Sequence, residues 1–266
     1  MDIATKRGRY EIIDRGEGTP VVLLHGFPFD AESWRGELDA LASRARLIAP
    51  SMRGFGGTPA FEMENLSIDA MADDVAAILD ALGVTEPVVV GGLSMGGYVT
   101  LAFARRHPRR LRGLVLADTR AEPDSEVART NRDRGIARIE GGDLAGFVAD
   151  LVPAILAPET RSDRPEVALR VRAMAMRAQP SSVVAMLRAL RDRPDAMPDL
   201  SSIEVPVQIV VGAEDALTPV SASYAMADAM EPGRASVNVI PRAGHLSNLE
   251  APEAFQELLA AFVARV

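Results

Sequence analysis

The stretch VVVGGLSMGGYVTLAFARR, residues 88–106, decides the fold of this chain. Its first part is a run of β-branched residues that predicts a buried strand, and its last part has the amphipathic pattern of a helix. Between them, four glycines surround Ser94. Glycine fits where a backbone turns sharply or where two backbones approach closely. The stretch therefore predicts a tight strand-to-helix turn with Ser94 at its tip.

Gly92-Leu93-Ser94-Met95-Gly96 matches the pattern G-x-S-x-G of a nucleophile elbow. In such a turn the serine is strained, its hydroxyl points outward, and the positions two before and two after it have no room for side chains. Both of those positions are glycine here. The alternatives are a glycine-rich turn with an incidental serine and a phosphate-binding loop. The second is weak, because neither G-x-G-x-x-G nor a following Lys-Ser/Thr pair is present.

A serine hydroxyl needs a base to take its proton, and the chain has 3 histidines. His107 lies at an expected helix end before a proline, which is typical of a surface or cap residue. His25 ends an apolar run and is expected to organise its loop. His245 follows the last expected strand, and Gly244 gives the chain freedom to aim its side chain. His245 is therefore the predicted base.

The other ring nitrogen of the base needs a carboxylate that orients it. Two expected strands are followed by one, Asp118 after LVLA and Asp215 within GAEDALTP. Asp215 is favoured, because its strand is the nearest in sequence to the one before His245. Asp118 is expected to anchor a loop or to lie at the pocket rim, and Glu214 to point elsewhere.

Acyl transfer passes through an oxyanion that needs two N–H donors. The Met95 amide is expected to be one, because it lies in a first helical turn, where no intrahelical acceptor exists and the helix dipole favours negative charge. The other donor is expected from the loop HGFP. Phe27 can donate there, whereas Pro28 has no N–H. An ordinary strand-to-helix loop is the alternative for HGFP.

Beyond these motifs, apolar β-branched runs alternate with helical patterns, which predicts an α/β fold with a largely parallel sheet buried on both faces. Residues 121–200 break the alternation, because they contain helical patterns and no convincing strand. We predict a helical cap over 121–200 and a core formed by 1–120 and 201–266. Two ordinary crossover helices with long loops are the alternative. The apolar runs cover residues 10–13, 20–25, 45–50, 87–92, 111–118, 205–212 and 235–240.

Composition excludes several classes of function. A net charge of -8 argues against a nucleic-acid-binding surface. The absence of cysteine excludes disulfides, thiolate metal sites and a cysteine nucleophile. We expect no metal and no cofactor. No apolar run approaches the roughly 20 residues that span a bilayer, and the N-terminus lacks the apolar middle of a secretion signal. A cytoplasmic location without a membrane partner is expected, and the oligomeric state is not predicted.

Five segments, HGFP, SMRGFGGTP, GLSMGGYVTLAFA, GAEDALTP and AGHLSNLEAPEAF, occur in this order. Together they resemble the α/β-hydrolase superfamily over nearly the whole chain, and within it small bacterial serine esterases, enol-lactone hydrolases and cofactor-free haloperoxidase-like enzymes. The resemblance implies a mostly parallel eight-stranded sheet flanked by helices, with one antiparallel strand near the N-terminus. It also implies a helical cap between the sixth and seventh strands.

The resemblance carries the nucleophile onto Ser94, the acid onto Asp215 and the base onto His245, in the order of the superfamily. The chain departs from many relatives at Ser51, where they have an acidic residue. Serine rather than aspartate at the elbow argues against epoxide hydrolases and haloalkane dehalogenases.

The predicted activity is hydrolysis of carboxylic esters of small to medium apolar substrates through an acyl-enzyme. Alternatives are a lactone hydrolase and an acyltransferase or perhydrolase with the same triad. A non-catalytic ligand-binding protein on this scaffold is a further alternative. Met174 and Met176 are candidates for the pocket, but we favour a role for both in packing the core of the cap. The residues expected to line an apolar substrate pocket are Phe27, Trp34, Met95, Met174, Met176 and Leu217.

Overall fold

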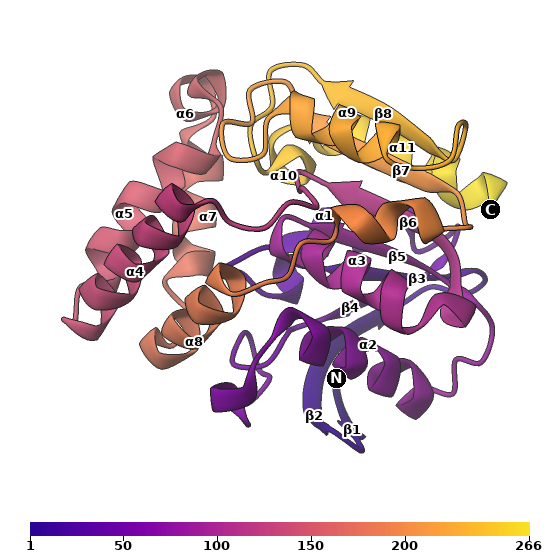
Figure 1. Cartoon of the computed structure of the whole chain (residues 1–266), viewed down its shortest axis with the longest axis horizontal. Coiled ribbons are helices and arrows are strands. Elements are labelled where there is room, and N and C mark those ends of the chain that lie inside the picture. Colours follow the sequence, from indigo (N-terminus) through magenta and orange to yellow (C-terminus); the bar gives the residue numbers. More distant parts are fainter.

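An eight-stranded sheet forms the centre of the molecule and carries helices on both faces (Figure 1). The computed structural model describes all residues from Met1 to Val266. The strand order is β1-β2-β4-β3-β5-β6-β7-β8. The strands are β1 (Asp2–Thr5), β2 (Gly8–Arg15), β3 (Pro20–Leu24), β4 (Arg46–Pro50), β5 (Val88–Leu93), β6 (Leu111–Ala117), β7 (Val207–Gly212) and β8 (Ala235–Ile240).

Only β2 runs against the other strands. It pairs antiparallel with both β1 and β4, whereas all pairs from β4 through β8 are parallel. Every residue of β3, β5 and β7 is buried, as a parallel sheet covered on both faces requires. The predicted mostly parallel eight-stranded sheet is confirmed. The apolar pattern missed β1, because the sequence DIAT buries none of its residues.

The helices outside the segment between β6 and β7 are α1 (Arg35–Leu41), α2 (Ile68–Ala81), α3 (Met95–Arg106), α9 (Val220–Asp228), α10 (Ser247–Glu250) and α11 (Pro252–Arg265). Short 3-10 turns are η1 (Ala31–Trp34), η2 (Met63–Asn65), η3 (Pro108–Arg110) and η4 (Met197–Ser202). None of the helices combines the length and the apolar content that crossing a membrane requires.

The segment between β6 and β7 contains helices and no strand. Figure 1 shows these helices together at one side of the sheet, at the left of the view. That this segment, residues 121–200, is a cap separate from the core stays a prediction. Its helices are α4 (Glu126–Glu140), α5 (Leu144–Ile155), α6 (Pro158–Asp163), α7 (Pro165–Ala175) and α8 (Pro180–Arg191).

Helix α2 illustrates how local sequence sets an element's ends. It begins after Ser67, whose hydroxyl accepts a hydrogen bond from the Ala70 N–H at 3.1 Å. Such a cap satisfies one of the amides that a helix start leaves free. It ends before Gly83, which has a φ of 66° that glycine adopts without strain.

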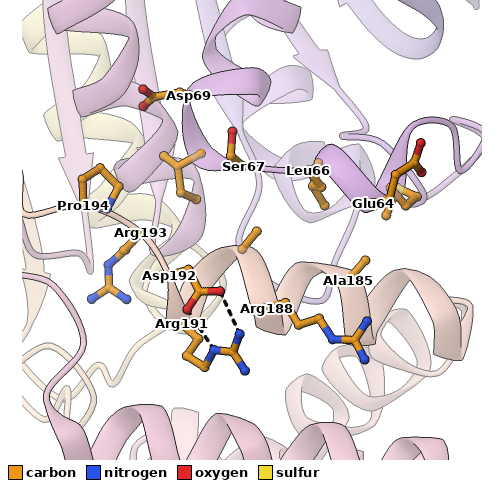
Figure 2. Close-up of a pocket in the computed structure, with 13 residues that line it drawn as sticks. Glu64, Leu66, Ser67, Asp69, Ala185, Arg188, Arg191, Asp192, Arg193 and Pro194 are labelled. Carbon is orange, nitrogen blue, oxygen red and sulfur yellow. Dashed lines mark hydrogen bonds and ion pairs between the residues drawn. The ribbon is translucent and has the colours of Figure 1, made fainter.

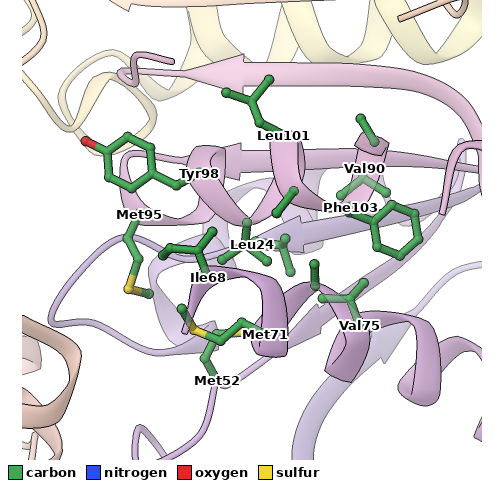
Figure 3. Packing of buried hydrophobic residues seen from close by; sticks show 14 of the residues in the cluster. Leu24, Met52, Ile68, Met71, Val75, Val90, Met95, Tyr98, Leu101 and Phe103 are labelled. Carbon is green, nitrogen blue, oxygen red and sulfur yellow. The ribbon is translucent and has the colours of Figure 1, made fainter. Parts of the chain in front are cut away.

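Two hydrophobic clusters lie on opposite faces of the sheet, because side chains alternate along each strand. Leu24 of β3 and Val90 of β5 belong to the cluster shared with α2 and α3, where Figure 3 shows them beside Met71 and Phe103. The other cluster joins the opposite faces of these strands to α1 and α11. The helices between β6 and β7 contribute to both clusters, so they pack onto the same core that holds the sheet.

Candidate active site

The turn between β5 and α3 holds Ser94 at φ 54° and ψ -111°, a region that residues other than glycine rarely adopt. Two hydrogen bonds of its backbone hold Ser94 in this conformation. The Ser94 N–H donates to the carbonyl of Ala117 at 2.8 Å, and the Ser94 carbonyl accepts from the Thr119 hydroxyl at 2.8 Å. Strain that neighbours enforce in this way is a common property of functional sites.

Two glycines make room for the turn. A Cβ on Gly92 would lie 2.1 Å from the backbone carbon and oxygen of Gly96. A Cβ on Gly96 would lie 2.1 Å from the carbonyl oxygen of Leu24. Both distances are far below van der Waals contact, so a side chain at either position would push β3, β5 and α3 apart.

Replacing Gly96 with alanine is expected to lower the free energy of unfolding by about 3 kcal/mol, because the added methyl group overlaps backbone that cannot rotate away. Urea denaturation measures the change. Gly36→Ala is the matched control, since Gly36 also lies in a helix and its Cβ would approach only the Gln256 side chain, at 3.3 Å. We expect that variant to be at least as stable as the wild type. Equal stability of Gly96→Ala and wild type would contradict the packing argument.

Ser94, His245 and Asp215 form a chain of hydrogen bonds. The Ser94 Oγ lies 2.7 Å from the His245 Nε2, and the His245 Nδ1 lies 2.8 Å from the Asp215 Oδ2. The three side chains follow β5, β8 and β7 respectively. Parallel strands end at the same edge of a sheet, which is why residues so distant in sequence meet.

The loop after β7 holds the Asp215 carboxylate in place. Its Oδ1 accepts from the N–H groups of Leu217 at 2.8 Å and Thr218 at 2.9 Å, and its Oδ2 accepts from the Thr218 hydroxyl at 2.6 Å. Sequence reasoning missed Thr218, although its place three residues after Asp215 in DALTP was a usable signal. The backbone N–H of His245 donates to the carbonyl of Ile155, at the end of α5, at 2.9 Å.

His245 and Asp215 each stabilise the charged form of the other. Burial of the imidazole favours its neutral form, but the Asp215 charge and hydrogen bond outweigh burial and raise the pKa of His245. Burial would raise the pKa of Asp215, yet the charge and hydrogen bond of His245 and the Thr218 bonds lower it. The ionised carboxylate therefore accepts a hydrogen bond from the Nδ1–H, and the proton stays on the ring. Nε2 is left free to accept the Ser94 hydroxyl proton.

Asp118 anchors loops and does not hydrogen-bond the imidazole. Its carboxylate accepts from the N–H of Gly212 at 2.9 Å, and from the N–H and hydroxyl of Ser247 at 3.0 and 2.5 Å. It thus ties the end of β7 to the loop that carries His245. Burial and the charge of Asp215 raise the pKa of Asp118 to about 7. The structure places Asp215, not Asp118, against the ring.

The other two histidines lie outside this chain of hydrogen bonds. The His25 Nε2 accepts from the Met52 N–H at 2.9 Å, and its Nδ1 lies 2.9 Å from the Gly26 carbonyl oxygen. Burial lowers the pKa of His25, so the ring is a neutral brace for its loop. The His107 Nε2 pairs with Asp73 at 2.9 Å, at the end of α3 remote from Ser94.

A cavity of about 360 Å³ opens onto Ser94 and His245. Phe27 and Met95 both line it, and neither backbone N–H donates a hydrogen bond within the protein. Two free amides beside a serine hydroxyl are the donors that an oxyanion needs. The apolar wall comes from Phe27, Met95 and Leu217 on the sheet side and from Phe147, Leu151 and Leu187 on α5 and α8.

Three residues expected at this cavity lie elsewhere. Trp34 is 1% exposed and packs against Phe255, with ring centroids 5.7 Å apart. Met174 is 3% exposed within the cluster that includes α1 and α11, and Met176 is 40% exposed after the end of α7. The expectation that they line the pocket is wrong, because the helical wall is formed by α4, α5 and α8 and includes no residue of α7. The burial of Met174 agrees with the packing role that is favoured for it above.

Sequence reasoning also missed residues that do line the cavity. Tyr98 lies one helical turn after Ser94 on α3, a spacing from which it was predictable. Arg120, Asp124 and Arg132 line it as well, and no local motif marks them.

A second cavity, of about 370 Å³, lies between residues 63–69 and α8 (Figure 2). None of the hydrogen-bonded residues Ser94, His245 and Asp215 lines it. Its three arginines have carboxylate partners. Arg191 pairs with Asp192 at 2.8 Å (Figure 2), and Arg188 pairs with Glu140 at 2.7 Å. Arg193 pairs with Asp124. Of these two cavities, only the one at Ser94 adjoins the hydrogen-bonded chain of Ser94, His245 and Asp215.

Comparison with known proteins finds a matching family model and several similar chains. A family model described as alpha/beta hydrolase fold matches residues 19–252. The solved structure of a thermophilic esterase from Thermogutta terrifontis is 36% identical and covers 100% of this chain and 98% of its own, with a TM-score of 0.94. The pimeloyl-[acyl-carrier protein] methyl ester esterase of Aeromonas hydrophila is 30% identical, over 93% of this chain and 96% of its own length. The 2-hydroxymuconate semialdehyde hydrolase of Pseudomonas sp. strain CF600 is 29% identical, over 96% and 90%.

Proposed function

This chain belongs to the α/β-hydrolase family, and from that membership we propose that it is a serine hydrolase that cleaves carboxylic esters of small to medium apolar substrates. One observation carries the proposal: the hydrogen-bonded chain from Ser94 through His245 to Asp215 opens onto a cavity with an apolar wall. Two relatives named as esterases, at 36% and 30% identity, favour an ester over other bonds that this family cleaves.

In the first half of the proposed reaction, the Ser94 Oγ attacks the carbonyl carbon of the ester while the His245 Nε2 takes the hydroxyl proton. Asp215 stabilises the imidazolium that results. The backbone N–H groups of Phe27 and Met95 bind the oxyanion, and each such donor is worth roughly 3 kcal/mol in the barrier. The tetrahedral intermediate collapses, and His245 gives its proton to the departing alcohol.

In the second half, water attacks the acyl-enzyme. His245 takes a proton from the water, the acid leaves, and Ser94 regains its proton. A lactone would follow the same steps, with the alcohol still attached to the acyl group. An acyltransferase or perhydrolase would differ only in what attacks the acyl-enzyme, so products distinguish these alternatives.

A fluorophosphonate is expected to label Ser94, and peptide mass spectrometry locates the adduct. A panel of esters of increasing acyl length and of lactones, with and without added alcohol or peroxide, tests the substrate class. We expect short and medium esters to give the free acid. A preference for long acyl chains would contradict the assigned pocket, and a transesterified or peracid product would assign acyl transfer. Absence of both label and turnover would leave a binding protein.

A further inference from the structure

The cavity at Ser94 has a charged end as well as an apolar wall. Apart from His245, the ionisable side chains that line it are those of Arg120, Asp124 and Arg132. The Asp124 side chain is fully buried and accepts a hydrogen bond from the Arg120 Nη2 at 3.1 Å. It also accepts hydrogen bonds from Arg132 and from Arg193. We call Arg120, Arg132 and Arg193 around Asp124 the arginine cluster.

The arginine cluster has more positive charge than Asp124 neutralises: three guanidinium groups surround one carboxylate, an excess of two positive charges. Glu122 does not supply the balance. It does not line the cavity, and its carboxylate has a buried oxygen without a hydrogen-bond partner. Charge that is partly withdrawn from water and not neutralised favours an anionic ligand.

The three arginines differ in how far the protein uses their donors. Arg193 also donates to the carbonyls of Leu190 and Glu122, each at 2.9 Å, and its guanidinium lies 4.2 Å from the Tyr98 ring centroid. Arg120 and Arg132 each bond only to Asp124. The Arg120 Nε is buried without a partner. The Arg193 Nε is unpartnered as well, but most of the donors that remain free belong to Arg120 and Arg132, the two arginines that line the cavity.

The arginine cluster is joined to the turn that carries Ser94. Arg120 directly follows Thr119, whose hydroxyl donates to the Ser94 carbonyl at 2.8 Å. Tyr98, on which Arg193 stacks, lies one turn beyond Ser94 in α3. A substrate of modest length can thus reach both Ser94 and the arginines within one cavity.

We propose that Arg120 and Arg132, held in place by Asp124, bind a carboxylate of the substrate, so that the preferred esters are anionic. The inference rests on the proposed function and names its substrate class. A guanidinium matches a carboxylate with two parallel hydrogen bonds, and such charge-assisted bonds are about twice as strong as neutral ones. The arginines then select the charged end while Ser94 acts on the ester.

The wild-type test compares charged substrates with neutral isosteres. One arm uses monoethyl esters of dicarboxylic acids from succinate to adipate, in which the charge lies on the acyl side. The other uses O-acetyl hydroxy acids, in which it lies on the alcohol side. Each anionic ester is compared with its neutral derivative, in which a primary amide replaces the carboxylate. We expect kcat/KM to favour the anionic member by roughly 10- to 100-fold in at least one arm. Sodium chloride should reduce that advantage.

Variants then assign the preference to the arginines. Arg132→Gln and Arg120→Gln are each expected to lower the anionic-to-neutral ratio of kcat/KM by about tenfold or more. The ratio is measured within one preparation, so a change in the folded fraction cancels. Arg129→Gln is the matched control, because it removes the same charge from an exposed position on α4 that does not line the cavity. It should leave the ratio at the wild-type value.

Two results would overturn the inference: a wild type that does not favour the anionic member in either arm, or equal ratios in Arg132→Gln and Arg129→Gln. Both leave the proposed function intact as long as wild-type hydrolysis of the neutral esters depends on Ser94. Neutral-ester hydrolysis that persists in Ser94→Ala would instead remove the proposed function itself.

Discussion

Ser94→Ala is expected to lower kcat/KM for ester hydrolysis by about 10⁴-fold or more. The substitution removes the oxygen that attacks the carbonyl, so no acyl-enzyme forms and only binding and oxyanion stabilisation remain. Alanine has the same Cβ as serine and takes the same strained backbone, and the Ser94 backbone bonds to Ala117 and Thr119 are retained. Folding should therefore be preserved. Initial rates on a reactive ester and a thermal melt measure the two effects.

Ser221→Ala is the control for this variant, because Ser221 is exposed on α9 and does not line the cavity at Ser94. Its rate should equal that of the wild type. A folded Ser94→Ala protein that keeps more than about a tenth of the wild-type rate would show that another group is the nucleophile. The assignment of the elbow as the reactive turn would then be wrong.

Asp215→Asn is expected to reduce kcat/KM by about 10⁴-fold. An amide at this position can present an N–H to the His245 Nδ1. The imidazole proton then moves to Nε2, which can no longer accept a proton from Ser94. The asparagine side chain still has one oxygen that can accept hydrogen bonds from the N–H groups of Leu217 and Thr218, so the loop remains in place.

The pH profile gives a second measurement on the same variant. The wild-type rate should fall at acidic pH as His245 becomes protonated, because only neutral imidazole can take the Ser94 proton. Since the Asp215 charge and hydrogen bond raise the pKa of His245, the midpoint of this fall should lie above the ordinary value of 6.5. In Asp215→Asn that attraction is gone and burial dominates, so the midpoint should move to lower pH.

Glu214→Gln provides the matched change of charge at the neighbouring position, which is exposed and is bonded through its N–H to Ala243. We expect its rate and its midpoint to match the wild type. If Asp215→Asn instead kept the wild-type rate and midpoint, another carboxylate would be orienting His245. Asp118 would then be the first to test, given its place between β7 and the His245 loop.

The elements that the sequence predicted well depend on contacts close in the chain. The turn at Ser94 was predictable because Gly92 leaves space for the backbone of Gly96, only four residues further along the chain. The uniformly apolar runs indicated strands buried on both faces, and β3, β5 and β7 have that burial. By contrast, β1 was missed, because this strand at the edge of the sheet packs too few side chains to leave an apolar pattern.

The predictions that failed concern which neighbour an apolar face meets. The apolar pattern of α7 correctly marks Met174 as buried, but a helix that lines the cavity and one that contributes no residue to its wall have the same pattern. Trp34 is likewise buried, against α11 rather than beside the substrate pocket. Hydrophobicity drives burial without direction, so it does not choose the partner surface.

By itself, the sequence determined the fold, the strained turn at Ser94, and the loops that carry Asp215 and His245. Each of these follows from the space that glycines leave, from the apolar runs that indicate strands, or from the edge of the sheet at which parallel strands end together. Only the tertiary structure decided which helices enclose the cavity and that Arg120, Arg132 and Arg193 gather around Asp124. Arginines spread over some seventy residues of a chain with net charge -8 look like ordinary surface charges until packing sets them around one buried carboxylate. Their excess charge is a property of the folded protein, because only there are the three held around Asp124, with Arg120 and Arg132 lining the same cavity as Ser94.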